Sequence, residues 1–266
     1  MPIQFDRLLS VDSAKAEKAL KYGYLNGIHY MAPAGTSGVN LCPNATAGCI
    51  ALCLGKYSGQ AGMVADQENG TNSVRDSRIA KAQMFMRERQ TYMQHLERQI
   101  ARLVAQAAKA DLIPCVRLNG STDIAFERMA YVGLDGRKLT LLERFSAVQF
   151  VDYTKIASRM DNAPANLSLT FSRSENNEAQ CLELLAKGHN VAIVFAHGLP
   201  VSRMWNGYRV IDGDKHDLRH LDPKGCVIGL SPKGRKAKAD MSGFVLRDYA
   251  ACEGPVTHAP IVRLAA

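Results

Sequence analysis

The longest regular pattern in this chain is helical and runs from about residue 73 to residue 110. Apolar side chains recur there at helical spacing with charged residues between them; they include Ile79, Ala82, Met86, Met93, Leu96, Ile100, Leu103 and Val104. This spacing places them on one face of a helix. A shorter pattern of the same kind predicts a helix over residues 11–21. Alternating apolar residues and turn formers predict a hairpin or an extended segment over residues 23–40.

Beyond residue 110 the pattern changes to short apolar runs, each followed by polar residues. The runs are LIPCVRL, AVQFVDY, LSLTF, VAIVF and CVIGL, and the clearest intervening helix is EAQCLELLAKG. Alternation of strands and helices predicts parallel strands joined by crossover connections, in a barrel or an open sheet. We therefore predict an α/β fold with a complete or partial TIM-like barrel. No repeat or linker divides the chain, so we expect one domain over residues 1–266, with an N-terminal extension and cysteine loop in 1–72 and the barrel core in 73–250.

Composition adds three expectations. The hydrophobic fraction of 47% and the charged fraction of 22% are typical of a globular protein. The first residues show no signal-peptide pattern, and no apolar stretch reaches the ~20 residues of a membrane span, so we expect a cytoplasmic protein without a membrane partner. The net charge of +8 predicts either a nucleic acid or nucleotide partner or a generally basic surface. Local basic clusters lie in the long helical stretch, with Arg75, Arg78, Arg87, Arg89, Arg98 and Arg102, and in PKGRKAKAD over residues 232–240.

Three cysteines lie within twelve residues, with six and then three residues between them: Cys42, Cys49 and Cys53. Thiolates clustered so closely are typical of a metal site, and three of them leave one coordination position open. A [4Fe-4S] cluster can be held by three cysteines alone, with its fourth iron open to a small molecule. Zinc is the alternative, and it needs a fourth ligand such as His29. The total of seven cysteines is odd, which argues against a complete disulfide framework; Cys115, Cys181 and Cys226 lie in or beside apolar runs and are expected to be buried.

Polar residues gather where the predicted strands end, which is where α/β folds place their functional groups. We predict catalytic roles for Asp123, Asp152, Lys155, Asp212, Asp214 and His216, and cofactor-binding roles for Asn119, Ser121, Ser172, Arg173, Ser174 and Glu175. Simpler interpretations stand beside these. Asp123 and Asp152 are suited to capping the following helices. The run SRSE fits a capping box, which leaves its arginine to bind phosphate or carboxylate. For the segment DGDKHD, we favour a hairpin turn that carries site residues. A metal site is the less favoured interpretation.

The ordered motifs APAGTSGVNLCPNATAGCIALCLGKYSG, VRLNGSTDI, FVDYTK, LTFSRSE and VIDGDKHDLRHLDPKGCVIGLSPKG resemble a family of phage and plasmid proteins over about residues 20–246. More distantly, the layout is similar to radical S-adenosylmethionine proteins of partial-barrel fold. That resemblance implies that the three cysteines ligate the cluster and that residues 119–123 and 172–175 grip S-adenosylmethionine. It also implies that GCVIGL forms a strand beneath the adenine. The cysteine spacing of that radical family is three and then two residues, and its glycine-glycine-glutamate strand motif is absent here.

Three functions are open on this basis. The first is an iron–sulfur metalloenzyme of the radical S-adenosylmethionine type that modifies a nucleic acid or nucleotide. The second is a zinc-containing base-exchange enzyme similar to the transglycosylases, with Asp123 or Asp152 as nucleophile or base. The third is a noncatalytic nucleic-acid-binding protein with a metal knuckle.

Overall fold

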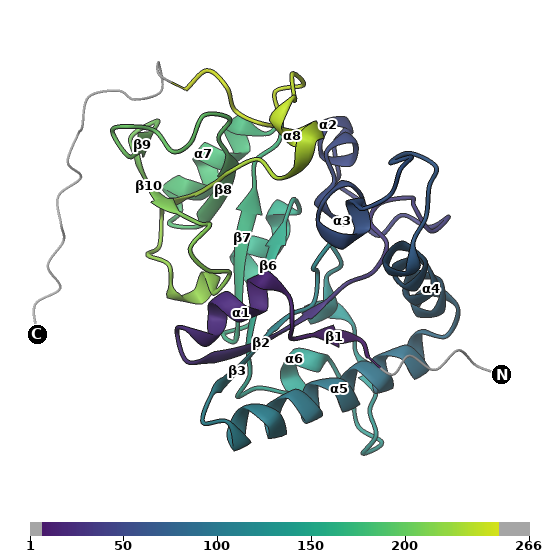
Figure 1. The fold of residues 1–266 in the computed structure, drawn as a ribbon. Helices are drawn as coiled ribbons and strands as arrows, with labels where there is room; N and C mark the ends of the chain where they lie inside the picture. Colours follow the sequence, from purple (N-terminus) through teal and green to yellow (C-terminus); the bar gives the residue numbers. More distant parts are fainter. Residues whose placement is uncertain (1–6, 250–266) are drawn as a thin grey trace, which may run out of the picture.

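The computed structural model describes residues 7–249 and has a nine-stranded sheet at its centre (Figure 1). The strands are ordered β1-β2-β3-β6-β7-β8-β11-β10-β9 across this sheet. Their bounds are β1 Leu9–Ser10, β2 Tyr24–His29, β3 Ile113–Arg117, β6 Gln149–Thr154, β7 Leu167–Ser172, β8 Asn190–Val194, β9 Met204–Trp205, β10 Tyr208–Asp212 and β11 Val227–Leu230. The strands from β2 to β10 in this order are all parallel, and β1 and β9 pair antiparallel at the two edges. The α/β class is therefore confirmed, but within residues 7–249 the sheet is open at β1 and β9 and closes no TIM-like barrel.

The helices cover mainly one face of this sheet. They are α1 Ala14–Leu20, α2 Ala47–Ala51, α3 Leu54–Tyr57, α4 Ser73–Arg87, α5 Arg89–Lys109, α6 Leu141–Arg144, α7 Glu178–Ala186 and α8 Gly234–Lys238, with 3-10 turns η1 Gly59–Gly62, η2 Phe126–Arg128, η3 Ala157–Asn162 and η4 Arg219–Leu221. Apolar residues of α4, α5 and α6 pack with Val116, Phe150 and Leu167 of the strands. Apolar residues of α7 pack with Phe171 and Val191. Because these strand residues share one side of the pleat, α4 to α7 form a single layer.

The opposite face of the sheet is covered by α1 and by the segment 213–224. Ala19 of α1 and Leu218 of that segment pack with Cys115 and Val151, and η4 lies against β6 and β7. Polar side chains also project from this face. The guanidinium of Arg117 stacks on the Tyr153 ring, with 4.7 Å from its carbon to the ring centroid. The sheet therefore has one apolar, helix-covered face and one mixed face.

The expected long helix at 73–110 is two helices in the structure. The backbone leaves the helical conformation at Glu88, with φ −129° and ψ 47°. This break lies between Phe85 and Tyr92, both buried, whose rings meet edge to face with centroids 5.6 Å apart. Apolar spacing is nearly the same on both sides of the break, so periodicity alone did not reveal it.

Two further elements differ from the sequence prediction. Residues 24–29 form a parallel strand inside the sheet, so the extended alternative is confirmed and the hairpin is not. The predicted hairpin turn at Asp212-Gly213 is wrong, because β10 ends at Asp212 and runs parallel to β11. A side-chain carbon at Gly213 would lie 2.4 Å from the Ile228 side chain, so the chain passes close to β11 as it leaves the strand. No helix in the described part of the chain is long and apolar enough to cross a membrane.

Candidate functional site

The three clustered cysteines lie in one loop near the short helices α2 and α3. Cys42 precedes α2, Cys49 lies within it, and Cys53 is the residue that precedes α3. All three are free thiols of intermediate exposure. Figure 1 places α2 and α3 at the top of the molecule, at the opposite end from α5. We call residues 41–57 the cysteine loop.

Contacts from three neighbouring strands fasten the cysteine loop to the sheet. The Cys42 thiol donates to the carbonyl of Ser121, which follows β3, at 3.7 Å. The Asn44 amide donates to the carbonyl of Lys155, which follows β6, at 3.2 Å. The Glu175 carboxylate, which follows β7, accepts two hydrogen bonds from the start of α2. The loop therefore lies over the carboxyl ends of β3, β6 and β7, the edge where parallel sheets place their functional groups.

Glu175 makes the closest of these attachments. Its carboxylate accepts from the Thr46 hydroxyl and from the Gly48 backbone N–H, both at 2.8 Å. A side-chain carbon at Gly48 would lie 2.8 Å from a Glu175 oxygen and 2.8 Å from the Ser242 hydroxyl. The absence of a side chain at Gly48 lets α2 approach both groups closely, and a larger residue would have to displace one of them. The predicted capping box of residues 172–175 is therefore wrong, since Glu175 caps α2 while α7 begins only at residue 178.

The three thiols influence one another electrostatically. Burial, together with negative charge on Cys53, Cys49 and Asp123, raises the pKa of Cys42 to about 12. Burial also raises the pKa of Cys49 and of Cys53. Lys155 acts on Cys49 in the opposite direction and lowers its pKa. The thiols are therefore protonated at neutral pH, and any metal that binds them must displace their protons.

The thiols are near one another without forming a metal-ligand group. Within residues 7–249, no set of three or more His, Cys, Asp or Glu side chains is arranged to hold a metal ion. His29, the candidate fourth zinc ligand, is already occupied. Its Nδ1 pairs with the Leu118 carbonyl at 2.9 Å and its Nε2 with the Tyr92 hydroxyl at 2.6 Å. Burial lowers the His29 pKa to about 4, so this side chain is a neutral, satisfied core histidine.

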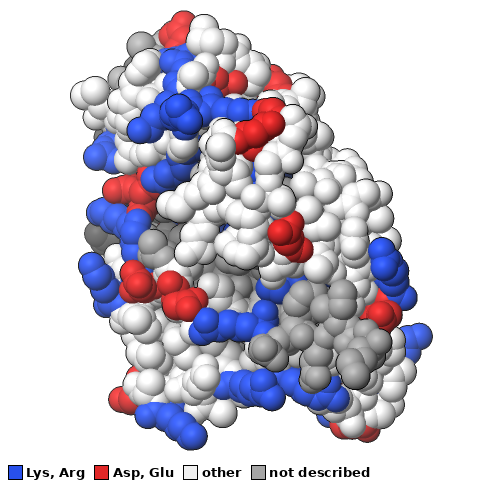
Figure 2. All heavy atoms as spheres, turned by 45° about the vertical axis from the view of Figure 1, so that its right-hand side comes forward, with Lys and Arg blue, Asp and Glu red and all other residues white. Residues whose placement is uncertain are grey.

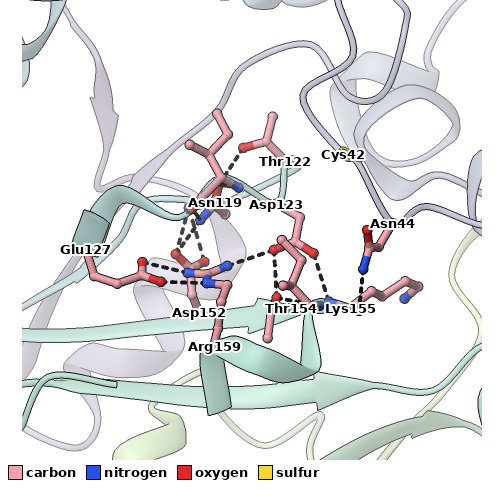
Figure 3. A network of polar contacts seen from close by, with 12 residues as sticks. Cys42, Asn44, Asn119, Thr122, Asp123, Glu127, Asp152, Thr154, Lys155 and Arg159 are labelled. Carbon is pink, nitrogen blue, oxygen red and sulfur yellow. Dashed lines mark hydrogen bonds and ion pairs between the residues drawn. The ribbon is translucent and has the colours of Figure 1, made fainter. Parts of the chain in front are cut away.

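The turn after β3 is built around Asn119. Its side-chain oxygen accepts from the Thr122 hydroxyl at 2.8 Å and from the Ile124 N–H at 2.9 Å. Its side-chain amide donates to the Ile124 carbonyl and to Asp152, and its backbone N–H also donates to Asp152 (Figure 3). Asp152 is buried on β6, and burial raises its pKa to about 7, while Arg117 acts against that shift. These two predicted site residues therefore shape the turn and cap no helix.

Asp123 is the centre of a second network, which Figure 3 shows beside the first. Its carboxylate accepts from the Thr154 hydroxyl at 2.8 Å, the Lys155 N–H at 2.8 Å and the Arg159 guanidinium at 2.7 Å. Arg159 also forms a two-point pair with Glu127, at 2.8 and 3.0 Å. The backbone N–H of Asp123 donates to the carbonyl of Leu41, at the start of the cysteine loop, at 2.9 Å. Asp123 thus joins the ends of β3 and β6 to that loop.

Lys155 and residues 172–174 complete this edge of the sheet. The Lys155 ammonium lies 5.2 Å from the centroid of the Phe244 ring. Arg173 pairs with Glu178 at 3.1 Å and donates to the Gly243 carbonyl at 2.9 Å, so it holds the C-terminal segment against the end of β7. Ser172 is partly exposed at the end of β7. Ser174 is buried and donates to the neighbouring Asn176 side chain.

The remaining predicted catalytic residues form a separate group. The Asp212 carboxylate accepts from the Asp214 N–H at 2.9 Å, and Asp214 pairs with Lys233 at 3.0 Å. The His216 ring contacts the Tyr22 ring, which follows α1, with centroids 4.7 Å apart. None of their described contacts reaches the cysteine loop. The structure therefore brings Asp123, Lys155 and Glu175 to the cysteines and leaves this second group beside α1.

Several residues of the predicted basic clusters have structural roles. Arg75 is buried and donates to four backbone carbonyls, those of Lys56, Ala61, Gln67 and Gly70. Arg78 donates to the Gly55 carbonyl and stacks on Tyr30. Lys236 pairs with Glu68 and lies over the Tyr57 ring. The charge available to a partner is therefore smaller than the sequence suggests, and it is concentrated on the remaining exposed cations.

Sequence reasoning missed the buried partners that organise this site. Arg159 and Glu127 were not recognised, although they fix Asp123 in place. Their signal in the sequence is weak, because Glu127 lies in the short 3-10 turn η2 and Arg159 in the short 3-10 turn η3. Thr46 and Asn44 lie within the quoted cysteine motif, but only the fold shows that they attach it to β7 and β6.

Comparison with known proteins gives one match. A family model described as Gene product 88 matches residues 7–248 of the chain. No curated protein and no solved structure matches this chain. The matched region includes the cysteine loop and every strand of the sheet. The similarity to radical S-adenosylmethionine proteins is not part of this match and stays a prediction.

Proposed function

We propose a function for this chain, which belongs to the Gene product 88 family: it is a metalloenzyme that holds a [4Fe-4S] cluster and modifies a nucleic acid or nucleotide. Cys42, Cys49 and Cys53 are the proposed ligands. The observation that carries this proposal is the position of their loop. Three free thiols lie over the carboxyl ends of three neighbouring parallel strands and are fastened there from each strand.

The set of donors favours three thiolate ligands and an open fourth position. His29 uses both ring nitrogens in the core. The carboxylates of Asp123 and Glu175 influence the thiols but already accept hydrogen bonds from the protein. A closed structural zinc site needs four ligands, whereas a cluster with one exchangeable position needs three.

Such a cluster, once bound and reduced by an external electron donor, would supply one-electron chemistry at its open position. The protein's own groups would then bind and orient that molecule. Lys155 offers a positive charge close to Cys49. The turn at 119–124 is held rigid by Asp152, so its backbone and Ser121 keep a fixed position beside Cys42. S-adenosylmethionine is the proposed co-substrate, and residues 119–123 and 172–175 are the groups that would hold it.

The strand order supports the finer fold proposal, a partial barrel of the radical S-adenosylmethionine type. From β2 through β3, β6 and β7 to β8, the parallel strands follow one another across the sheet in chain order. Helices α4 to α7 cover one face, as they would the outside of a barrel.

No observation favours the base-exchange alternative. That reaction needs a carboxylate free to act as nucleophile or base. Asp152 is buried and accepts bonds from Asn119, while Asp123 accepts from three donors, one of them the Arg159 guanidinium. Both carboxylates therefore serve the turn and the strand ends.

The test is anaerobic purification followed by measurement of iron, acid-labile sulfide and zinc, with the visible absorption spectrum. We expect iron and sulfide in equal amounts and the broad visible absorption of a cluster. Cys49→Ala should lose both, while Cys181→Ala, which removes a buried thiol of α7, should keep them. A colourless protein that carries zinc would contradict the proposal.

The reaction class needs a second experiment. The reduced, loaded protein is incubated with S-adenosylmethionine and either DNA or RNA, and the digested nucleosides are analysed by mass spectrometry. We expect a nucleoside of altered mass that is absent when Cys49→Ala replaces the wild-type protein. Unaltered nucleosides from both polymers and from free nucleotides would reject a role in nucleic acid modification.

A further inference from the structure

A hollow of about 590 Å³ lies on the helical side of the sheet, between α5 and the hairpin of β4 (Tyr131–Val132) and β5 (Lys138–Leu139). Its charged lining consists of Arg98, Arg102, Arg137, Arg144, Glu97 and Asp135. Four guanidinium groups therefore face two carboxylates. In Figure 1, α5 lies at the bottom of the molecule, far from α2 and α3, so this hollow is separate from the cysteine loop.

Both carboxylates of the hollow are engaged by its own walls. Glu97 accepts from the Tyr131 hydroxyl at 2.9 Å and lies 3.7 Å from Arg144. Asp135 pairs with Arg137 at 2.6 Å and with Arg144 at 2.7 Å. These acids hold the hairpin to α5 and α6. They therefore neutralise Arg137 and Arg144, and they form no ion pair with Arg98 or Arg102 of α5.

Arg98 and Arg102 are exposed, and no carboxylate pairs with either of them within residues 7–249. They are four residues apart on α5, so they lie side by side on one face of the helix. Like charges at this spacing repel each other and destabilise the helix. Figure 2 shows Lys and Arg side chains in a row along the lower part of the face it views, at the height of α5.

Arg144 adds a further guanidinium to the wall of the hollow, held there by Asp135 and by the Arg137 carbonyl. Its side chain is only 7% exposed, yet its Nε has no hydrogen-bond partner in the described structure. Gly133 makes room for it, because a side-chain carbon there would lie 2.1 Å from the guanidinium.

We propose that this hollow binds the phosphodiester backbone of a polynucleotide. Arginine is well suited to phosphate because its planar fork donates to two oxygens at once. The free pair on α5 offers two such forks beside the guanidinium of Arg144. This inference deepens the proposed function by making the substrate a polymer, since the hollow and the cysteine loop lie at opposite ends of the molecule. The binding itself needs no cluster, so the two proposals fail separately.

The experiment measures binding of fluorescent single-stranded DNA and RNA to the full chain by anisotropy, over a range of salt concentrations. The test variant is Arg98→Gln with Arg102→Gln. Its matched control is Arg87→Gln with Lys109→Gln, which removes the same charge from exposed residues outside the hollow. Loss of two phosphate contacts should lower the salt slope by about 1.4 and the affinity roughly 25-fold at ~0.1 M salt. The control should lose clearly less.

The outcomes separate the sources of phosphate. Mononucleotide or inorganic phosphate is added as a competitor at the same phosphate concentration as the labelled polymer. If the polymer stays bound, the result supports the proposal. Displacement by mononucleotide at that concentration overturns the polymer as occupant. Equal losses in the two double variants, or no binding of either polymer by the wild-type protein, overturn the site.

Discussion

Replacing Glu175 with alanine should release the cysteine loop from the sheet. Its carboxylate is the attachment from β7, where it accepts from the Thr46 hydroxyl and the Gly48 N–H. The N–H of Gly48 belongs to the first turn of α2, which has no intrahelical acceptor for it. Without the carboxylate, that donor and the Thr46 hydroxyl lose their partner, and the loop loses its attachment to β7 while it keeps those of Cys42, Asn44 and Leu41.

The size of the effect follows from the two hydrogen bonds. A bond to a charged group contributes about 1.5–3 kcal/mol. Glu175 is partly exposed, so water replaces part of the loss, and we expect the loop to be destabilised by about 2 kcal/mol. That corresponds to a roughly 30-fold increase in the population with the loop open. Burial raises the pKa of Glu175, but the hydrogen bonds it accepts lower it below 4.5 overall. The stabilisation is therefore complete above pH 4.5 and is lost as the pH falls through the lower, folded value.

The assay is the rate at which a thiol reagent labels Cys49 in the metal-free protein near neutral pH, resolved by peptide mass spectrometry. We expect labelling about 30-fold faster in Glu175→Ala than in the wild-type protein. Glu175→Gln should be intermediate, since its amide oxygen still accepts one bond. Glu183→Ala, which removes an exposed carboxylate from α7, is the matched control. Equal labelling rates in Glu175→Ala and the control would refute the view that this carboxylate holds the loop.

Three further predictions concern stability. Arg159→Met leaves its two carboxylate partners without a cation and should lower the free energy of unfolding in urea by about 3–5 kcal/mol, whereas no change would mean that this network is not structural. Gly55→Ala places a carbon 2.6 Å from the Ser121 side chain and should cost about 1–3 kcal/mol, seen as a lower Tm; an unchanged Tm would show that the loop is not packed there. The pKa of Asp152 is raised by burial to about 7, above its unfolded value of 3.8, so the wild-type protein should lose stability as the pH rises from about 4 to 7. Asp152→Asn should make the urea midpoint depend less on pH in that window, and an identical slope would contradict the assignment.

The strands could be predicted because the apolar pattern that defines each one lies within a few consecutive residues. LIPCVRL, LSLTF and VAIVF are apolar runs bounded by polar residues, and each became a strand of the parallel sheet. The convergence of Asp123, Lys155 and Glu175 with the cysteines also followed, because the carboxyl ends of parallel strands share one edge.

What could not be predicted depends on contacts distant in sequence. The chemistry that suits Glu175 to a local capping box also suits it to capping α2, 127 positions away, and only the fold decides between them. Arg75 belongs to a basic cluster in the sequence, but its side chain is buried among backbone carbonyls. The interruption of the long helix at Glu88 likewise depends on how Phe85 and Tyr92 pack in the core.

The central claim is that the cysteine loop holds an iron–sulfur centre with one open position. Mössbauer spectroscopy on protein loaded anaerobically with enriched iron and sulfide tests it most directly. We expect the spectrum of a four-iron cluster in the wild-type protein and its loss in Cys42→Ala, Cys49→Ala and Cys53→Ala. On addition of S-adenosylmethionine, one iron of the wild-type cluster should become distinct from the others. Spectra that show only unclustered iron, or a cluster that survives loss of all three thiols, would contradict the claim.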